Sequence, residues 1–136
     1  MKVVVDTNVL VSGMNRLNTC GQVIDLWVNR DIVPCVSTAL ALEYEAVLLR
    51  HCKIRKAAKV QAALQALLSR AQFVPILFSY RPMSPDPADD MVIDCAMNAQ
   101  APIITMNTKD FVAAAEQLGL ALYTPDSFIN DRSREV

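Results

Sequence analysis

The chain has 136 residues, 53% of them hydrophobic, and a formal net charge of −1 at pH 7. These values exclude an intrinsically disordered chain and predict one domain, residues 1–136, with a substantial core. The low net charge also means that any contact with a nucleic acid must come from a local basic patch. We recognise neither a leader peptide nor an apolar run that could span a bilayer, so we expect a cytoplasmic protein.

Five apolar runs predict strands, and helical patterns separate them. The strand candidates are Lys2–Val5, Asp31–Val36, Phe73–Phe78, Pro102–Thr105 and Leu120–Tyr123. The helix candidates are Cys20–Asn29, Thr38–Arg50, Arg55–Arg70, Ala88–Asn98 and Lys109–Leu118. Ser37 and Asp86 are placed to cap helices, and Gly119 to end one. Pro34 and Pro75 weaken two of the strands. The alternation predicts a parallel sheet in a three-layer α/β sandwich, with helices on both faces.

The four cysteines are Cys20, Cys35, Cys52 and Cys95. No two of them form a CxxC pair, and their neighbours are apolar. Buried thiols are therefore a better interpretation than disulfides or zinc ligands. Trp27 and Tyr44 are interpreted as core residues.

Acidic and amide side chains gather where the predicted strands and helices meet. Asp6 closes the first strand, and the carboxyl ends of parallel strands face one crevice. The other candidates that we expect at this rim are Glu43, Asp86, Asp89, Asp90, Thr105 and Asn107. Clustered carboxylates repel one another unless a cation binds, and oxygen ligands suit Mg²⁺ or Mn²⁺. Such a metal is the usual means of hydrolysing a phosphodiester.

Several of these residues have simpler interpretations. Asp86 before a proline is better explained as a helix cap than as a ligand. Asp90 is a secondary candidate behind Asp89, and Asp94, one turn further on, is expected to be a solvated surface acid. Glu43 and Glu45 have equally apolar neighbours at helical spacing, so periodicity does not choose between them.

The sequence resembles the PIN-domain ribonucleases, and within them the toxin components of toxin–antitoxin systems related to VapC. The motifs that carry this resemblance are VVVDTNVLVSG, STALALEYEAVL, DPADDMVIDCA, IITMNTKDF and LYTPDSF. It places the three family acids at Asp6, Glu43 and Asp89, with Asn8 in the usual amide position. The resemblance also implies a five-stranded parallel sheet, Mg²⁺ or Mn²⁺, cleavage of RNA, dimers, and an antitoxin partner.

The chain departs from the family pattern at the fourth site position. Many members have Asp where this chain has Asn107, which can ligate a metal but carries no charge. Asp110, one turn further on, can partly compensate for the missing charge. This departure leaves an alternative open, in which the chain is a catalytically weak or inactive PIN scaffold that binds RNA or a protein partner.

A short basic segment contains the only histidine, His51. The residues that we consider for contact with RNA or with an acidic partner are Arg50, Lys53, Arg55 and Lys56. A solvated link between two helices explains the same residues, and short basic runs are weak signals.

Overall fold

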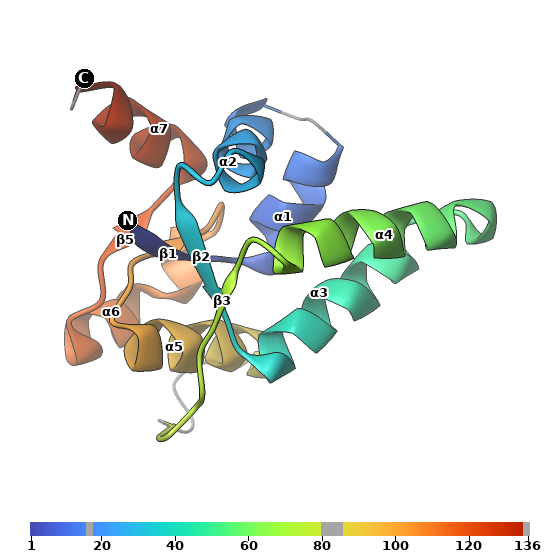
Figure 1. Cartoon of the computed structure of the whole chain (residues 1–136). Helices are drawn as coiled ribbons and strands as arrows, with labels where there is room; N and C mark the ends of the chain where they lie inside the picture. Colours follow the sequence, from blue (N-terminus) through green and yellow to red (C-terminus); the bar gives the residue numbers. More distant parts are fainter. Residues whose placement is uncertain (16–17, 80–85, 135–136) are drawn as a thin grey trace.

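A computed structural model describes residues 1–15, 18–79 and 86–134. Within them, five parallel strands form a sheet in the order β3-β2-β1-β4-β5 (Figure 1). The strands are β1 Lys2–Val5, β2 Val33–Val36, β3 Gln72–Phe73, β4 Ile103–Ile104 and β5 Leu122–Tyr123. The α-helices are α1 Thr7–Met14, α2 Asn18–Val28, α3 Thr38–Arg50, α4 Ala57–Leu68, α5 Pro87–Ala99, α6 Val112–Leu118 and α7 Pro125–Arg134. Two 3-10 turns are η1 Ile54–Lys56 and η2 Thr108–Asp110. The predicted α/β sandwich is confirmed.

Strand β1 lies at the centre of the sheet and determines where a site can form. It pairs with β2 on one side and with β4 on the other, so the order of the strands reverses at β1. In Figure 1, α2 and α7 lie on one side of the sheet and α5 and α6 on the other. Ligand crevices in open parallel sheets form at the carboxyl end of such a switch point, which here is the end of β1.

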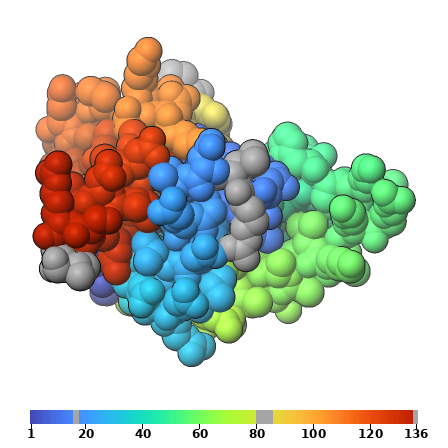
Figure 2. All heavy atoms as spheres, turned by 90° about the horizontal axis from the view of Figure 1, so that it is seen from above, coloured from blue at the N-terminus to red at the C-terminus, as the bar shows by residue number. Residues whose placement is uncertain are grey.

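Helices α3 and α4 pack against each other and extend beyond the sheet. Figure 2 shows their connecting end projecting from the body of the molecule. Ser37 caps α3 as predicted, because its side chain accepts a hydrogen bond from the Leu40 N–H at 3.1 Å. This cap fixes the start of α3 directly after β2, at the same edge of the sheet as the end of β1.

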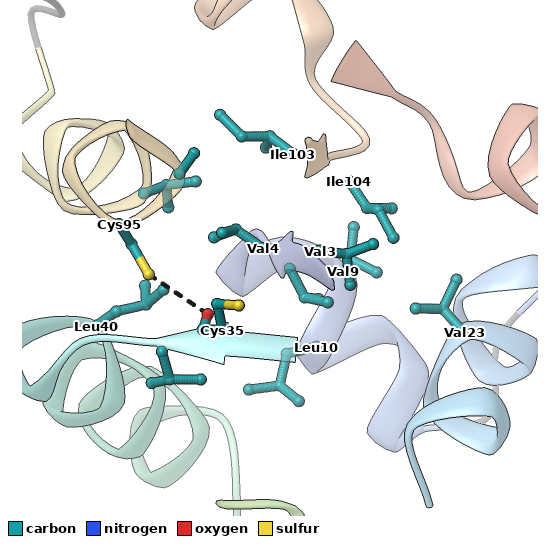
Figure 3. Packing of buried hydrophobic residues seen from close by; sticks show 14 of the residues in the cluster. Val3, Val4, Val9, Leu10, Val23, Cys35, Leu40, Cys95, Ile103 and Ile104 are labelled. Atoms are coloured by element: carbon teal, nitrogen blue, oxygen red, sulfur yellow. Dashed lines mark hydrogen bonds between the residues drawn. The ribbon is translucent and has the colours of Figure 1, made fainter. Parts of the chain in front are cut away.

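The buried core surrounds β1, whose three valines are fully buried (Figure 3). Trp27 and Tyr44 are core residues, as predicted, and their rings pack edge to face with their centroids 6.4 Å apart. The Tyr44 hydroxyl donates to the Val5 carbonyl, and the Trp27 indole N–H donates to the Leu67 carbonyl at 2.8 Å. These bonds join α3 to β1 and α2 to α4, and they satisfy polar atoms that would otherwise be buried without partners.

The cysteines behave as expected, because all four are free thiols and only Cys52 is not fully buried. The Cys95 thiol donates to the Cys35 carbonyl at 3.4 Å inside the core (Figure 3). In the described ranges, no helix combines the length and the apolar character that crossing a membrane requires.

Three expectations about the elements are wrong. The predicted strand Phe73–Phe78 is paired only over Gln72–Phe73, and residues 74–79 are irregular. Helices α1 and α7 were not predicted at all. Asp94 is buried, at 4% exposure, and not a solvated surface acid, because it lies on the side of α5 that carries the buried residues.

Candidate metal and active site

A pocket of about 420 Å³ lies at the carboxyl end of β1, and we call it the acidic pocket. Four separate segments line it: the start of α1, the inner face of α3, the start of α5 and the turn after β4. The carboxylate and amide side chains among its lining residues are Asp6, Asn8, Glu43, Asp86, Asp89, Asn107 and Asp110. The structure thus brings the three acids of the predicted metal site, Asp6, Glu43 and Asp89, into one cavity.

Asp6 is the most constrained of these acids. Its N–H donates to the Ile104 carbonyl at 2.9 Å, which fixes the backbone between β1 and β4. Oδ1 accepts from the Thr7 N–H at 2.8 Å, so Asp6 is the N-cap of α1. Oδ2 accepts from the Thr105 hydroxyl at 2.7 Å. With 7% exposure, Asp6 presents a carboxylate of fixed orientation to the pocket.

The surroundings of Asp6 disfavour its negative charge. Burial is the largest effect and raises the pKa of Asp6 above its usual value. The hydrogen bonds from Thr105 and Thr7 oppose that rise, whereas the nearby carboxylates Asp110 and Asp86 increase it. The pocket therefore carries the electrostatic repulsion that a bound cation would relieve.

Helix α3 contributes one face to the pocket, and the structure distinguishes the two glutamates that periodicity could not. Glu43 is half-buried and lines the pocket, whereas Glu45 is exposed and lies outside it. Val47 and His51 follow Glu43 at successive helical intervals and line the same pocket. His51 therefore belongs to the wall of the acidic pocket, although the sequence associated it with the basic link. Its spacing of eight residues from Glu43 was the signal that could have revealed this.

The start of α5 contributes two acids with different local roles. Asp86 caps the helix, as predicted, because its side chain accepts from the Ala88 N–H at 3.0 Å. Pro87 occupies the first turn, where its missing N–H costs nothing. Asp89 lines the pocket one turn into the helix. Asp90, the secondary candidate, is buried and does not line the pocket.

The turn after β4 connects Thr105 to the amide at the fourth site position. The Asn107 N–H donates to the Thr105 hydroxyl oxygen at 3.0 Å, and the Asn107 side chain donates to Asp110 Oδ2 at 2.6 Å. The Met106 N–H donates weakly to Asn8 Oδ1 at 3.4 Å. Thr105 is fully buried and orients Asp6 from behind. Asn107 and Asp110 thus act as one hydrogen-bonded unit at the rim.

The donor set agrees chemically with a hard divalent cation. The polar lining consists mainly of carboxylate, amide and hydroxyl oxygens, which Mg²⁺ and Mn²⁺ prefer, and His51 is its one imidazole. Yet across residues 1–15, 18–79 and 86–134, no three His, Cys, Asp or Glu side chains are grouped closely enough to hold an ion. The chemistry of the pocket fits the metal, but direct ligation by Asp6, Glu43 and Asp89 stays a prediction.

The basic side chains form a separate surface. Arg50, Lys53, Arg55 and Lys56 are exposed near the junction of α3 and α4, and none of them lines the acidic pocket. Their neighbour His51 does line it, so the basic segment begins at the rim of the pocket. Thr7 and Ser12 also line the pocket, and Ser12 was not predicted because its position in the pocket depends on the unpredicted helix α1.

Comparison with known proteins agrees with this arrangement. The sequence pattern of the PIN domain matches residues 2–109. The chain belongs to the PIN domain family. Its fold is similar to that in a crystal structure of VapBC2 from Rickettsia felis bound to a DNA fragment from their promoter. That match has a TM-score of 0.66 and 18% identity, and it covers 91% of this chain and 98% of the other.

A second solved structure has a similar fold. FitAcB from Neisseria gonorrhoeae matches with a TM-score of 0.61 and 17% identity, over 92% of this chain and 98% of the other. A search of curated protein sequences gave no match. The resemblance to PIN domains stated from the sequence is therefore confirmed, and these two neighbours support the fold.

Proposed function

We propose that this PIN domain is a ribonuclease that depends on Mg²⁺ or Mn²⁺ and hydrolyses RNA phosphodiester bonds. The observation that carries this proposal is the acidic pocket, where five carboxylates from four separate segments line one cavity at the switch point of the sheet. The raised pKa of Asp6 supports it: burial is the main cause, the carboxylates Asp110 and Asp86 add to it, and a perturbed acid in a cleft is typical of a functional site.

In this proposal, Asp6, Glu43, Asp89 and Asn107 hold the ion. A bound divalent ion supplies charge neutralisation at the phosphate and lowers the pKa of water. Thr105 positions the reaction by fixing Asp6 through its hydroxyl group. Water attacks phosphorus in line with the departing 3′ oxygen, so the products carry a 5′-phosphate and a 3′-hydroxyl group.

We further propose that the chain is the toxin of a toxin–antitoxin pair. Support comes from the similarity to VapBC2 and from the sequence motifs shared with VapC relatives. The expected partner is a small antitoxin protein that blocks the acidic pocket, and the expected assembly is a homodimer or a higher homo-oligomer. Light scattering after size-exclusion chromatography measures that assembly, and a small overlapping upstream reading frame would support the antitoxin.

The rival proposal is an inactive PIN scaffold, and its support is Asn107. This amide replaces a family acid, and its side chain is already hydrogen-bonded to Asp110. A scaffold would bind RNA or a protein partner through the same pocket and the basic segment, without cleaving.

Cleavage of RNA tests the two proposals directly. Purified chain is incubated with end-labelled RNA in Mg²⁺, in Mn²⁺ and in EDTA, beside Asp6→Asn and Asp89→Asn. We expect slow cleavage with either metal, none in EDTA, and a loss of at least about 100-fold in each variant, as for removal of a group that stabilises the transition state. Circular dichroism verifies that both variants fold.

Helix α3 offers a matched pair of variants. Glu43→Gln removes a pocket carboxylate, and Glu45→Gln makes the same change on the same helix outside the pocket. Only Glu43→Gln is expected to reduce cleavage. Identical RNA patterns from wild type and Asp6→Asn would establish the scaffold instead. Products with 2′,3′-cyclic phosphates would refute hydrolysis by water.

A further inference from the structure

A second pocket, of about 590 Å³, adjoins the acidic pocket, and we call it the side pocket. Met106 lines both pockets, so it is the wall between them. Met106 is 46% exposed, and its N–H donates a long hydrogen bond to Asn8 Oδ1 at 3.4 Å. A polymer whose phosphate occupies the acidic pocket therefore reaches the side pocket by crossing one side chain.

The polar lining of the side pocket is almost uncharged. Asn18 and Gln22 lie four residues apart on α2, on one helical face, and Thr124, directly before α7, lines the same pocket. Among its described lining residues there is no Lys or Arg. The one carboxylate, Asp126, accepts a hydrogen bond from the Thr19 hydroxyl at 2.6 Å. Neutral amides that both donate and accept are suited to the edge of a nucleobase.

The wall nearest the acidic pocket is soft and apolar. The Cys20 thiol donates to Met106 Sδ at 3.5 Å, and both residues line the side pocket. Burial is the main cause of the raised pKa of Cys20, and Asp126 adds to it, so the thiol stays neutral at neutral pH. Sulfur atoms make favourable contacts with aromatic rings, and a base is a flat aromatic ring.

The residues that line the side pocket are also held in place before any ligand binds. The bond from Thr19 to Asp126 joins α2 to α7 across the pocket. Thr124 and Ser127 exchange two backbone-to-side-chain bonds, at 2.9 and 3.0 Å, at the start of α7. The Phe128 ring packs edge to face against the Tyr123 ring, with the centroids 5.5 Å apart, and so anchors α7 to β5. A pocket organised in this way loses little conformational entropy on binding.

We propose that the side pocket binds one base of the RNA next to the phosphodiester bond that is cleaved, with Gln22 and Asn18 reading the base edge and Met106 contacting its face. This inference rests on the proposed nuclease function. It assigns sequence preference to a surface of the PIN domain other than the carboxylate cluster.

Binding of short RNAs tests the inference without cleavage. Fluorescein-labelled hexaribonucleotides of A, C, G and U are titrated into the Asp6→Asn chain in Mg²⁺, and their anisotropy gives four dissociation constants. The same titrations are repeated with three double variants, which combine Asp6→Asn with Gln22→Ala, with Gln22→Glu or with Gln65→Ala. Gln65→Ala is the control, because Gln65 is an exposed glutamine on α4 that does not line the side pocket. Asn18 is left intact because its positive φ of 53° makes substitution a strain on α2.

We expect one hexamer to bind best and Gln22→Ala to weaken that hexamer about 5-fold, the value of one hydrogen bond, while the others change less. Gln22→Glu should weaken it further, and Gln65→Ala should change nothing. Equal weakening of all four hexamers by Gln22→Ala, a preference unaffected by both Gln22 variants, or no measurable binding of any hexamer would each overturn the inference. Failure of the nuclease is separate, because it is seen as absent cleavage by wild type whatever the hexamers show.

Discussion

Replacing Thr105 by valine tests how the buried carboxylate at the end of β1 is held. Valine has a similar shape but removes the hydroxyl that donates to Asp6 Oδ2 and accepts from the Asn107 N–H. The second bond is only partly buried, and its donor residue Asn107 is exposed, so water can reach the Asn107 N–H when the bond is lost. The first bond is buried, and a hydrogen bond to a charged group contributes about 1.5–3 kcal/mol. We therefore expect Thr105→Val to lower the free energy of unfolding by about 2 kcal/mol at neutral pH.

The loss should depend on pH in a defined direction. Burial raises the pKa of Asp6 in the folded chain above that in the unfolded chain, so its contribution to stability is fully present at low pH and is lost as pH rises through the folded pKa. The Thr105 bond lowers that pKa and so limits the loss. Without it, stability should fall more steeply with rising pH, and the difference between wild type and variant should shrink towards acid pH.

Urea unfolding in EDTA, followed by the fluorescence of the one tryptophan, measures this difference. Trp27 is fully buried and hydrogen-bonded, so its emission should change on unfolding. A loss of 2 kcal/mol corresponds to a shift of about 1 M in the urea midpoint. Thr105→Ser keeps the hydroxyl and is the matched control. Equal midpoints for the valine and serine variants at neutral pH, or a difference that does not vary with pH, would refute this account of Asp6.

Three further changes test the supporting structure by the same urea assay. Gly13→Ala would place a Cβ 2.7 Å from the Cys20 carbonyl oxygen, so helices α1 and α2 would have to move apart. We expect the free energy of unfolding to fall by about 1–2 kcal/mol, despite the gain in helix propensity. An unchanged or higher stability would contradict this packing. Tyr44→Phe removes the buried donor to the Val5 carbonyl and should cost about 1–3 kcal/mol, whereas no loss would mean that water replaces the bond. Asp86→Ala should lower the free energy of unfolding by about 1 kcal/mol, because it removes the cap of α5. Asp86→Asn should lose much less, because asparagine also caps helices; an equal loss would mean that the charge and not the cap stabilises α5.

The sequence predicted the elements well where long apolar patterns bury one face, and less well where other interactions decide. Helix α1 has only eight residues, so its apolar run is too short to show a distinct period. Its valines also disfavour a helix. What makes it helical is the cap from Asp6 and its packing against α2. Helix α7 is polar and is held mainly by Pro125 and Phe128, too few apolar positions to define a period.

The third strand shows how a side chain can replace a neighbouring strand. The apolar run Phe73–Phe78 satisfies the pattern of a strand, but Pro75 has no N–H to pair. Beyond it, the Asn98 side chain accepts from the Leu77 N–H at 2.9 Å and donates to the Phe78 carbonyl at 2.9 Å. Those backbone groups are satisfied by α5 and not by the sheet, which local sequence cannot reveal.

The candidate site was predictable to the extent that parallel strands bring their ends together. From the sequence alone, that rule places Asp6 and the turn after β4 at one rim. It could not choose Glu43 over Glu45, because both have apolar neighbours and only the rotation of α3 against the sheet separates them. Nor could it place His51, whose basic neighbours suggested an exposed link.

The amide at the fourth position illustrates what the structure adds to the interpretation of a single substitution. From the sequence, Asn107 is a missing charge. In the fold, its side chain donates to Asp110, which lines the same pocket and acts on the pKa of Asp6. An aspartate at position 107 could not donate that bond and would place two carboxylates side by side. The asparagine therefore holds Asp110 at the rim of the pocket by a hydrogen bond that an ionised aspartate could not donate.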